Sequence, residues 1–330
     1  MKQWINQVMG SSRRMAVPIM THPGIEKIGK HVADAVSDGQ VHYEAIKALS
    51  EEYPSAACTV IMDLTVEAEA FGCVINMPED EVPTVRERLV CDAESVNALK
   101  VPGLDAGRIP EYLKANRLSA ANIQDKPVLS GCIGPYSLAG RLYDMSEIMV
   151  AIYIDPETIQ TLLSKCTEFI LNYCQALKAT GVAGIVMAEP AAGLLSNEDC
   201  QAFSTEYVKQ IVDAVQDENF SVILHNCGNK GQCTDAMIAS GAAGLHFGNA
   251  IDLVETLEKC PENMLVMGNI DPVNIFKTQT PEKVKEVTTA LLERTRKYKN
   301  FVISSGCDIP PHTPHANIEA FYKAVEEYNR

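Results

Sequence analysis

The sequence predicts an α/β fold, in which a (β/α)8 TIM barrel carries an N-terminal helical extension and a small hairpin insertion. Eight apolar runs of strand length are rich in Val and Ile and are continuous rather than alternating, which is typical of parallel strands buried on both faces. Amphipathic stretches separate the runs, and eight strands that alternate with helices favour a closed barrel over an open sheet. The runs are residues 15–21, 56–65, 126–134, 181–189, 221–228, 241–248, 263–271 and 300–308.

Two of the stretches between the runs begin with clear helix signals. Asp155 is suited to cap a helix over 155–180, and the Pro156 that follows fits the first helical turn. Thr280, followed by a proline, begins a second helix over 280–298 in the same way. Both stretches therefore predict long helices that cover the sheet.

Shorter segments complete the predicted domain. The links at 229–240 and 249–262 leave room for one short helix each. We expect residues 1–14 to form a helical preface and residues 71–85 to form the hairpin. A length of 330 residues would suffice for two domains, but α/β barrels use this length for one. We therefore expect residues 1–330 to form a single domain.

Composition excludes several classes of protein. The chain has 28 Lys and Arg against 43 Asp and Glu, and its net charge of −15 would repel a nucleic-acid backbone. No apolar run approaches the roughly 20 residues of a membrane-spanning helix, and the N-terminus lacks the apolar stretch of a signal peptide. We therefore expect a cytoplasmic protein with no membrane partner and with reduced thiols. Its 11 cysteines are then buried apolar side chains or metal ligands, not a disulfide framework.

The carboxyl ends of the strands are where barrel enzymes hold their active sites. The fifth run ends with His225 and Cys227, which are two positions apart and so face the same side of a strand. The eighth run ends near Cys307, which shares the same rim. One imidazole and two thiolates suit Zn²⁺, and three protein ligands leave the fourth position open, as in catalytic zinc sites. Alternatively, Cys233 or His312 closes a four-ligand structural site.

Acidic and polar side chains at other strand ends are candidates for substrate contacts. Asp63, Glu67 and Glu189 are candidates for catalysis or substrate binding, although capping a helix or pairing with an arginine is the alternative for each acid. Glu69 and Asp271 fit the capping role better. The residues expected to line the pocket are Tyr136, Asn226, His246, Asn269 and His312.

The charge of such a zinc site indicates its chemistry. Two thiolates and a neutral histidine neutralise Zn²⁺, and a bound substrate thiolate leaves a net charge of −1. That charge keeps the bound sulfur nucleophilic, while the metal keeps it deprotonated near neutral pH. A zinc ion with several thiolate ligands is a weak Lewis acid, so alkyl transfer to a thiol is favoured over hydrolysis.

Several segments resemble one known family over nearly the whole chain. They are DLTVEAEAFG (63–72), GPYSLAG (134–140), HNCG (225–228), GLHFGNAIDL (244–253), MGNIDPV (267–273) and SSGCDIPPHTPHANI (304–318). The chain resembles the uroporphyrinogen decarboxylase superfamily, and within it the methylcobalamin:coenzyme M methyltransferases. The resemblance implies that His225, Cys227 and Cys307 bind zinc. It also implies that a partner corrinoid protein supplies methylcobalamin and that a thiol such as coenzyme M accepts the methyl group.

Three other functions stay open at this point. The decarboxylase branch, which needs no metal, fits less well because its arginine-rich RQAGRY-like loop is reduced here to Arg13 and Arg14. Its GHGI-like segment is also replaced by SGCDIP. A methyltransferase with a pterin acceptor is a second alternative. A non-catalytic module that binds a corrinoid protein and uses zinc structurally is a third.

Overall fold

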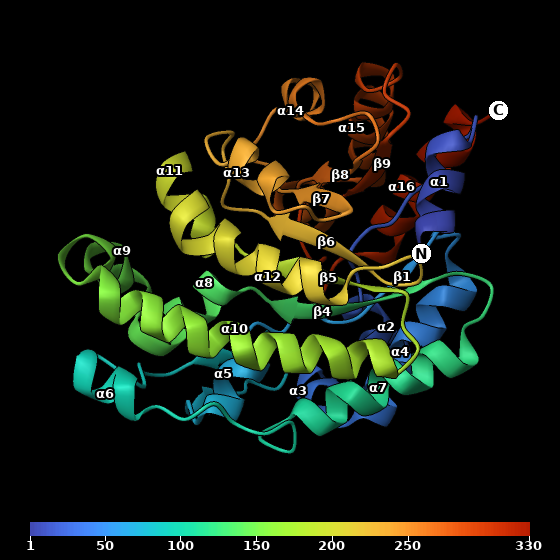
Figure 1. The fold of residues 1–330 in the computed structure, drawn as a ribbon. Helices are drawn as coiled ribbons and strands as arrows, with labels where there is room; N and C mark the ends of the chain where they lie inside the picture. The colour runs from blue at the N-terminus through green and yellow to red at the C-terminus, as the bar shows by residue number, and fades with distance from the viewer.

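The computed structural model describes residues 1–330, and its centre is a curled sheet of seven strands. Every neighbouring pair of strands is parallel, in the order β1-β4-β5-β6-β7-β8-β9 (Figure 1). The α/β barrel class predicted from the continuous apolar runs is therefore confirmed. The strands are β1 (Cys58–Thr59), β4 (Val128–Ile133), β5 (Gly184–Ala188), β6 (Ser221–Asn226), β7 (Gly244–Phe247), β8 (Leu265–Ile270) and β9 (Phe301–Ser305).

The first predicted strand, residues 15–21, forms only a single bridge, at Ala16 to Ile303 of β9. On its other side the Ala16 carbonyl accepts a hydrogen bond from the Ala56 amide at 2.9 Å. Pro18 lies in the middle of the segment and has no N–H to donate, so a regular ladder cannot continue past it. The segment nevertheless runs between β9 and β1, and it occupies the place of the eighth strand.

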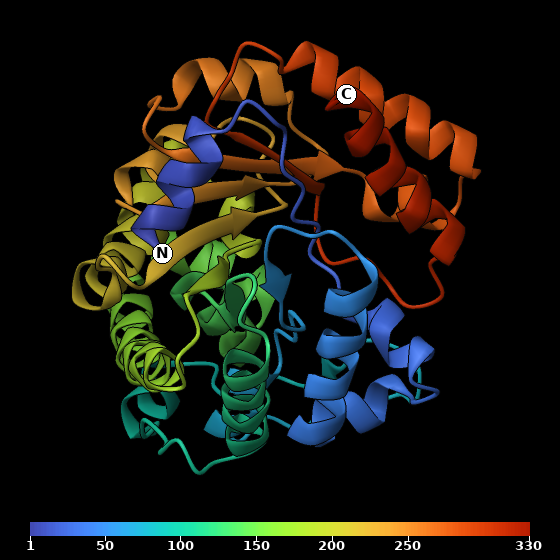
Figure 2. The ribbon, with the colours of Figure 1, turned by 90° about the vertical axis from the view of Figure 1, so that its right-hand side faces the viewer.

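Side chains on the sheet alternate between two cores. Along β6, Ile223 belongs to the apolar cluster inside the barrel, whereas Val222 and Leu224 belong to the larger core under the helices. Helix α1 (Lys2–Gly10) contributes Ile5 and Val8 to the inner cluster. The predicted helical preface therefore packs against the barrel interior, and Figure 2 shows α1 lying across the strands.

Helices surround the sheet and account for the amphipathic stretches between the strands. The long α10 lies beside α12, and α15 lies beside α16 (Figure 1). Asp155 caps α10 through the Thr158 amide, as predicted. The remaining helices are α2 (His22–Lys27), α3 (Val32–Ser37), α4 (Gly39–Glu52), α5 (Val66–Phe71), α6 (Ala93–Ala98), α7 (Ile109–Asn122), α8 (Pro135–Tyr143), α9 (Met145–Ile154), α10 (Pro156–Ala179), α11 (Asn197–Cys200), α12 (Glu206–Val215), α13 (Thr234–Ala239), α14 (Leu253–Lys259), α15 (Pro281–Arg294) and α16 (His315–Tyr328).

Short irregular helices and a hairpin interrupt this pattern. The 3-10 helix η1 (Ala191–Leu194) follows β5, and two π-helical segments are η2 (Gln201–Thr205) and η3 (Pro272–Lys277). The predicted hairpin forms from β2 (Ile75–Asn76) and β3 (Thr84–Val85), which pair antiparallel.

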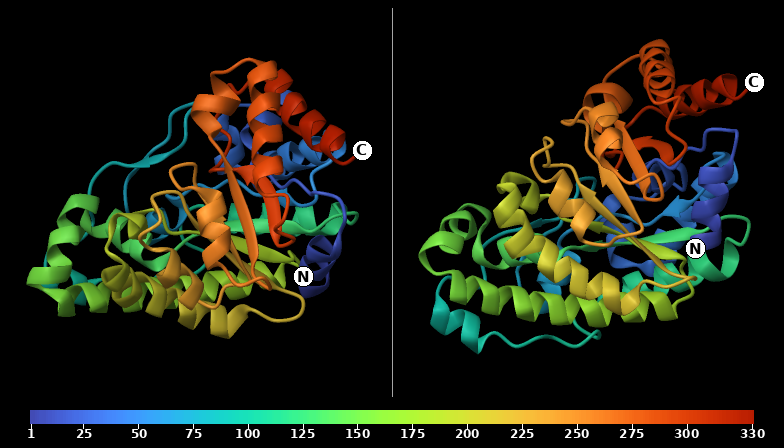
Figure 3. Two further views of the ribbon diagram at one scale, coloured as in Figure 1. Left: turned by 90° about the horizontal axis from the view of Figure 1, so that it is seen from above. Right: turned by 45° about the horizontal axis from the view of Figure 1, so that its top comes forward.

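The two chain ends lie on the same side of the molecule (Figure 3). The Asn329 side chain accepts a hydrogen bond from the Arg14 amide at 2.7 Å and donates one to the Arg14 carbonyl at 2.9 Å. The last helix therefore fastens the segment that leads into the barrel closure. None of the helices is both long enough and apolar enough to cross a membrane.

The packing of α1 predicts that substitutions on its buried face lower the free energy of unfolding more than substitutions on its exposed face. Replacing the buried Ile5 by alanine should lower the free energy of unfolding by roughly 2–5 kcal/mol, because it leaves a cavity in the inner core. Replacing the exposed Gln7 by alanine is the control and should change stability by less than about 0.5 kcal/mol. Urea unfolding followed by circular dichroism measures both, and equal effects would contradict this packing.

Candidate metal and active site

The structure brings the three predicted metal ligands together at the carboxyl ends of β6 and β9. His225 lies two residues beyond Ile223 and therefore shares its inner face of β6, and Cys227 follows the strand. Cys307 follows β9. One potential ligand atom from each of the three residues lies within 4.8 Å of the other two. The cluster joins positions that are 80 residues apart in the sequence, because parallel strands end at a common rim.

The turn that carries Cys227 is shaped by its neighbours. The Asn226 side-chain oxygen accepts hydrogen bonds from the amides of Gly228 and Asn229, both at 2.9 Å. Gly248, after β7, packs so closely that a methyl group there would come within 2.6 Å of the Cys227 Cα. Asn269 holds the loop after β7 by donating to the Gly248 carbonyl at 3.0 Å. Asn226 and Asn269 were expected to line the pocket, but neither belongs to the wall of the cavity beside the cluster. Their hydrogen bonds instead shape the Cys227 turn and the loop packed against it.

His225 has one nitrogen engaged and one free. Its Nδ1 lies 2.8 Å from the Nδ1 of His246, while its Nε2 is buried and has no hydrogen-bond partner. A buried polar atom without a partner is costly, and a bound ion is one of the arrangements that would satisfy it. His246, expected to line the pocket, lies fully buried behind His225.

The three candidate ligands line a cavity of about 210 Å³. Contact between the two thiols lowers the pKa of Cys227 and raises the pKa of Cys307, so Cys227 loses its proton first. The cavity wall contains no lysine or arginine. Its other residues are His22, Met62, Leu64, Val82, Ala188, Pro190, Asp308 and Pro310.

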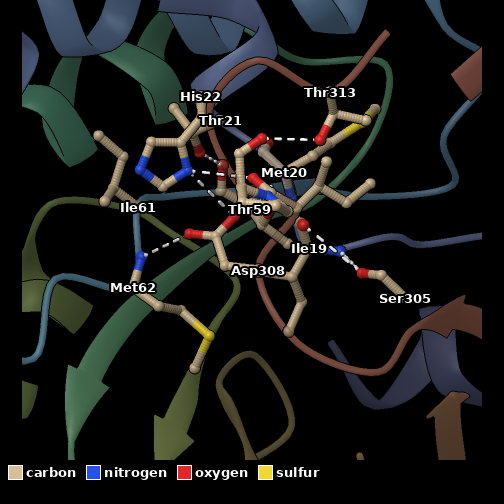
Figure 4. Close-up of polar contacts among 12 residues, drawn as sticks. Ile19, Met20, Thr21, His22, Thr59, Ile61, Met62, Ser305, Asp308 and Thr313 are labelled. Atoms are coloured by element: carbon tan, nitrogen blue, oxygen red, sulfur yellow. Dashed lines mark hydrogen bonds and ion pairs between the residues drawn. The ribbon is translucent and has the colours of Figure 1, made fainter. Parts of the chain in front are cut away.

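His22 and Asp308 are the polar wall residues that sequence reasoning missed. The His22 Nδ1 lies 3.2 Å from the Ile309 carbonyl and 3.6 Å from an Asp308 carboxylate oxygen (Figure 4). The Met62 amide donates to the other Asp308 oxygen at 3.3 Å. Burial is the largest single influence on His22 and opposes its protonation, but the charge and hydrogen bond of Asp308, the Ile309 carbonyl and the charge of Asp63 together outweigh burial and raise the pKa of His22. A signal was present, since Asp308 is the last residue of the eighth apolar run and His22 directly follows the first.

Asp63, a candidate for substrate contact, lies in a buried ion pair outside the cavity wall. Its Oδ2 accepts from the Arg108 guanidinium at 2.5 Å and from the Tyr112 hydroxyl at 3.0 Å. Arg108 also pairs with Glu69 at 2.6 Å. Asp63 therefore has the alternative role that the sequence analysis allowed, which is pairing with an arginine.

Glu67 and Glu189 are also buried outside the cavity wall, and both tie helices to strands. The Glu189 carboxylate accepts from the Tyr136 amide at 2.8 Å and from the Ser137 amide at 3.0 Å, at the start of α8. Glu67 accepts from the Ile133 amide at 3.0 Å, and its second oxygen has no partner. Burial raises the pKa of each carboxyl to about 7.

The remaining candidates are not part of the cavity wall. The Tyr136 side chain is fully buried. His312 is exposed, and its Nδ1 lies 3.4 Å from Glu26. Cys233 is buried, with its thiol directed at the carbonyls of Ala192 (3.4 Å) and Leu195 (3.3 Å). Neither His312 nor Cys233 belongs to the group of three ligands.

The fold and the site together define a parallel α/β barrel in which one imidazole and two thiols converge beside a cavity at the rim. The sequence model of the uroporphyrinogen decarboxylase (URO-D) family matches residues 12–328, and the chain belongs to that family.

Relatives with two different activities are similar to it. Methylcobamide:CoM methyltransferase MtbA of Methanosarcina acetivorans is 30% identical over 276 residues, covering 82% of this chain and 80% of the relative. Uroporphyrinogen decarboxylase of Psychromonas ingrahamii is 24% identical over 282 residues, covering 82% and 78%. A solved methyltransferase from Methanosarcina mazei matches 99% of this chain and 98% of its own with a TM-score of 0.89 at 23% identity, which is a likeness of fold.

The buried Glu67 predicts a pH-dependent contribution to stability. Its folded pKa of about 7 exceeds the unfolded value near 4.3, so its contribution is present at low pH and is lost as the pH rises toward 7. Glu67→Gln should therefore be more stable relative to the wild type at pH 8 than at pH 5, by roughly 2–4 kcal/mol. Urea midpoints at both pH values test this, with the exposed Glu168→Gln as control. An equal shift at both pH values would contradict it.

Proposed function

We propose that this protein is a zinc-dependent methyltransferase that moves a methyl group from a methylcobalamin, carried by a partner corrinoid protein, to a thiol. The observation that carries the proposal is the cluster of His225, Cys227 and Cys307, whose ligand atoms lie within 4.8 Å of one another beside a cavity. One imidazole nitrogen and two cysteine sulfurs are donor atoms that suit Zn²⁺. The Nε2 of His225 has no hydrogen-bond partner in the protein, so it is available to bind a metal. Three ligands leave a fourth position for the substrate.

Each part of the site then has a defined task. A bound zinc ion would hold the acceptor sulfur as a thiolate near neutral pH. His225, Cys227 and Cys307 would hold that ion and would thereby set the position of the sulfur. The apolar wall, including Met62, limits water around it, which strengthens electrostatic interactions and protects the nucleophile. The acceptor sulfur forms the new bond to the methyl carbon, and the carbon–cobalt bond breaks with its electron pair left on cobalt.

The names of the relatives support a methylcobamide as the methyl donor, and the size of the cavity supports a small methyl acceptor. The relative with the higher identity is a methylcobamide:CoM methyltransferase, and coenzyme M is a thiol. A volume of about 210 Å³ lies below the roughly 300–1,000 Å³ of sites for drug-sized ligands. A tetrapyrrole with several carboxylates is larger and would need cations that the wall lacks, so the decarboxylase function is not favoured.

The proposal predicts the effect of losing one ligand. Cys307→Ala should reduce bound zinc per chain to a small fraction of the wild-type value and reduce thiol methylation by at least about 100-fold, since the thiolate is no longer held. Metal analysis of the purified protein and the absorbance change of methylcobalamin with coenzyme M or homocysteine as acceptor measure the two effects. Cys91→Ala is the matched control, because Cys91 is exposed and lies outside the cluster.

A wild-type protein without zinc would refute the proposal, as would a Cys307→Ala variant with normal zinc and normal activity. Release of carbon dioxide from uroporphyrinogen, without bound zinc, would instead support the decarboxylase alternative.

Gly248→Ala tests the support of Cys227 without removing a ligand. The added methyl group would meet the Cys227 Cα at 2.6 Å, so the turn must move. We expect zinc affinity to fall by roughly 10-fold or more while the far-ultraviolet circular dichroism spectrum is retained. Gly10→Ala is the control, because its added methyl group meets nothing within 4 Å. Unchanged affinity in Gly248→Ala would show that the turn tolerates the displacement.

A further inference from the structure

Behind the candidate ligand His225, a line of hydrogen-bonded groups crosses the inside of the barrel. His225 on β6 is directly opposite His246 on β7, and their Nδ1 atoms are 2.8 Å apart. The other nitrogen of His246, Nε2, lies 2.9 Å from the Ser304 hydroxyl on β9. Ser304 in turn donates to the Val17 carbonyl at 2.6 Å. All three side chains are buried, so water does not substitute for these partners.

Counting hydrogens along this line assigns a direction to every bond. The Ser304 hydroxyl has one hydrogen, and the short contact to the Val17 carbonyl uses it, since a carbonyl can only accept. The Ser304 oxygen must then accept from Nε2–H of His246. A neutral histidine with Nε2–H has a lone pair on Nδ1, and His225 must supply the hydrogen of the Nδ1–Nδ1 contact. The Nε2 lone pair of His225 is therefore free, in agreement with its lack of any partner in the protein.

We propose that His246 is the positioning residue that fixes the tautomer and ring orientation of His225, so that the His225 Nε2 lone pair is presented to the metal. The inference rests on the proposed zinc site. Ser304 and the Val17 carbonyl hold His246 in the required tautomer. Through them, the segment that closes the barrel also orders the metal ligand.

The chemical nature of His246 matters for the reaction as well. Histidine ligands commonly donate their second N–H to a carboxylate, a carbonyl or water. A carboxylate at this place would add a negative charge to a site that already holds two thiolates. A neutral imidazole accepts the same hydrogen bond without that charge. His246 thus orients His225 while leaving the charge of the site to the metal, the cysteines and the substrate thiolate.

Two substitutions of His246 separate its role as a hydrogen-bond acceptor for His225 from the packing of its ring. His246→Phe keeps an aromatic ring but offers no acceptor, and zinc affinity should fall by about 10–100-fold. His246→Asn places an oxygen near the position of Nδ1, and affinity should stay within about 10-fold of the wild type. His42→Phe is the matched control, because His42 is also fully buried but accepts its hydrogen bond from the Ile61 amide, not from His225. Competition with a chelator measures zinc affinity, and the absorption bands of the Co²⁺-substituted protein report the ligand set.

Nitrogen NMR of histidine-labelled wild-type protein, recorded without metal, tests the tautomers directly even if a variant folds poorly. We expect Nδ1–H on His225 and Nε2–H on His246. The opposite tautomers, or a His246→Phe variant that binds zinc with wild-type affinity, would overturn the inference and leave the proposed function intact. A wild-type protein that binds no zinc would overturn both.

Discussion

The parallel pairing of the strands is the constraint on which the rest of the structure depends. It aligns the carboxyl ends of β6 and β9 at one rim, so His225, Cys227 and Cys307 meet although the sequence separates them. Pairing also fixes the register, which sets His225 opposite His246. Because side chains alternate along a strand, the same pairing sends Ile223 to the inner core and His225 to the layer above it.

The barrel interior is consequently divided into layers of different chemistry. Apolar side chains, including Ile5 from α1, fill the lower layer and supply the stability of the closed sheet. The layer above contains His246 and Ser304, and His246 pairs with His225 through Nδ1 and with Ser304 through Nε2, while Ser304 donates to the Val17 carbonyl. Buried polar groups are tolerated where every partner is provided, and such a network rigidifies its members. The cavity lies above this layer, so the candidate ligands rest on an ordered support.

The sequence predicted the fold class from local periodicity, and it predicted that the three side chains meet from that periodicity together with the rule that parallel strands end at a common rim. Continuous apolar runs indicated buried parallel strands, and the spacing of His225 and Cys227 indicated a shared face. The same reasoning could not tell which acids at strand ends face the rim cavity. Asp63 pairs with Arg108, and Glu189 accepts hydrogen bonds at the start of α8. These partners come from segments remote in the sequence, so the sequence alone did not indicate the contacts. The sequence also predicted a full strand at residues 15–21 despite Pro18. The structure shows that this segment pairs with β9 only through the bridge from Ala16 to Ile303.

The cavity wall narrows the chemistry that this rim can support. Its one carboxylate, Asp308, is close to His22, and its remaining non-ligand residues are apolar. In the proposed reaction, an anionic acceptor tail would find no lysine or arginine in this wall, so attraction between the proposed zinc ion and the acceptor sulfur would have to supply most of the binding. Val82, between β2 and β3, also lines the cavity, so the hairpin insertion contributes to its wall. The proposed transfer would require a sulfur held at the cluster to remain accessible to the methyl group of a partner protein, because the reacting atoms must be close and aligned.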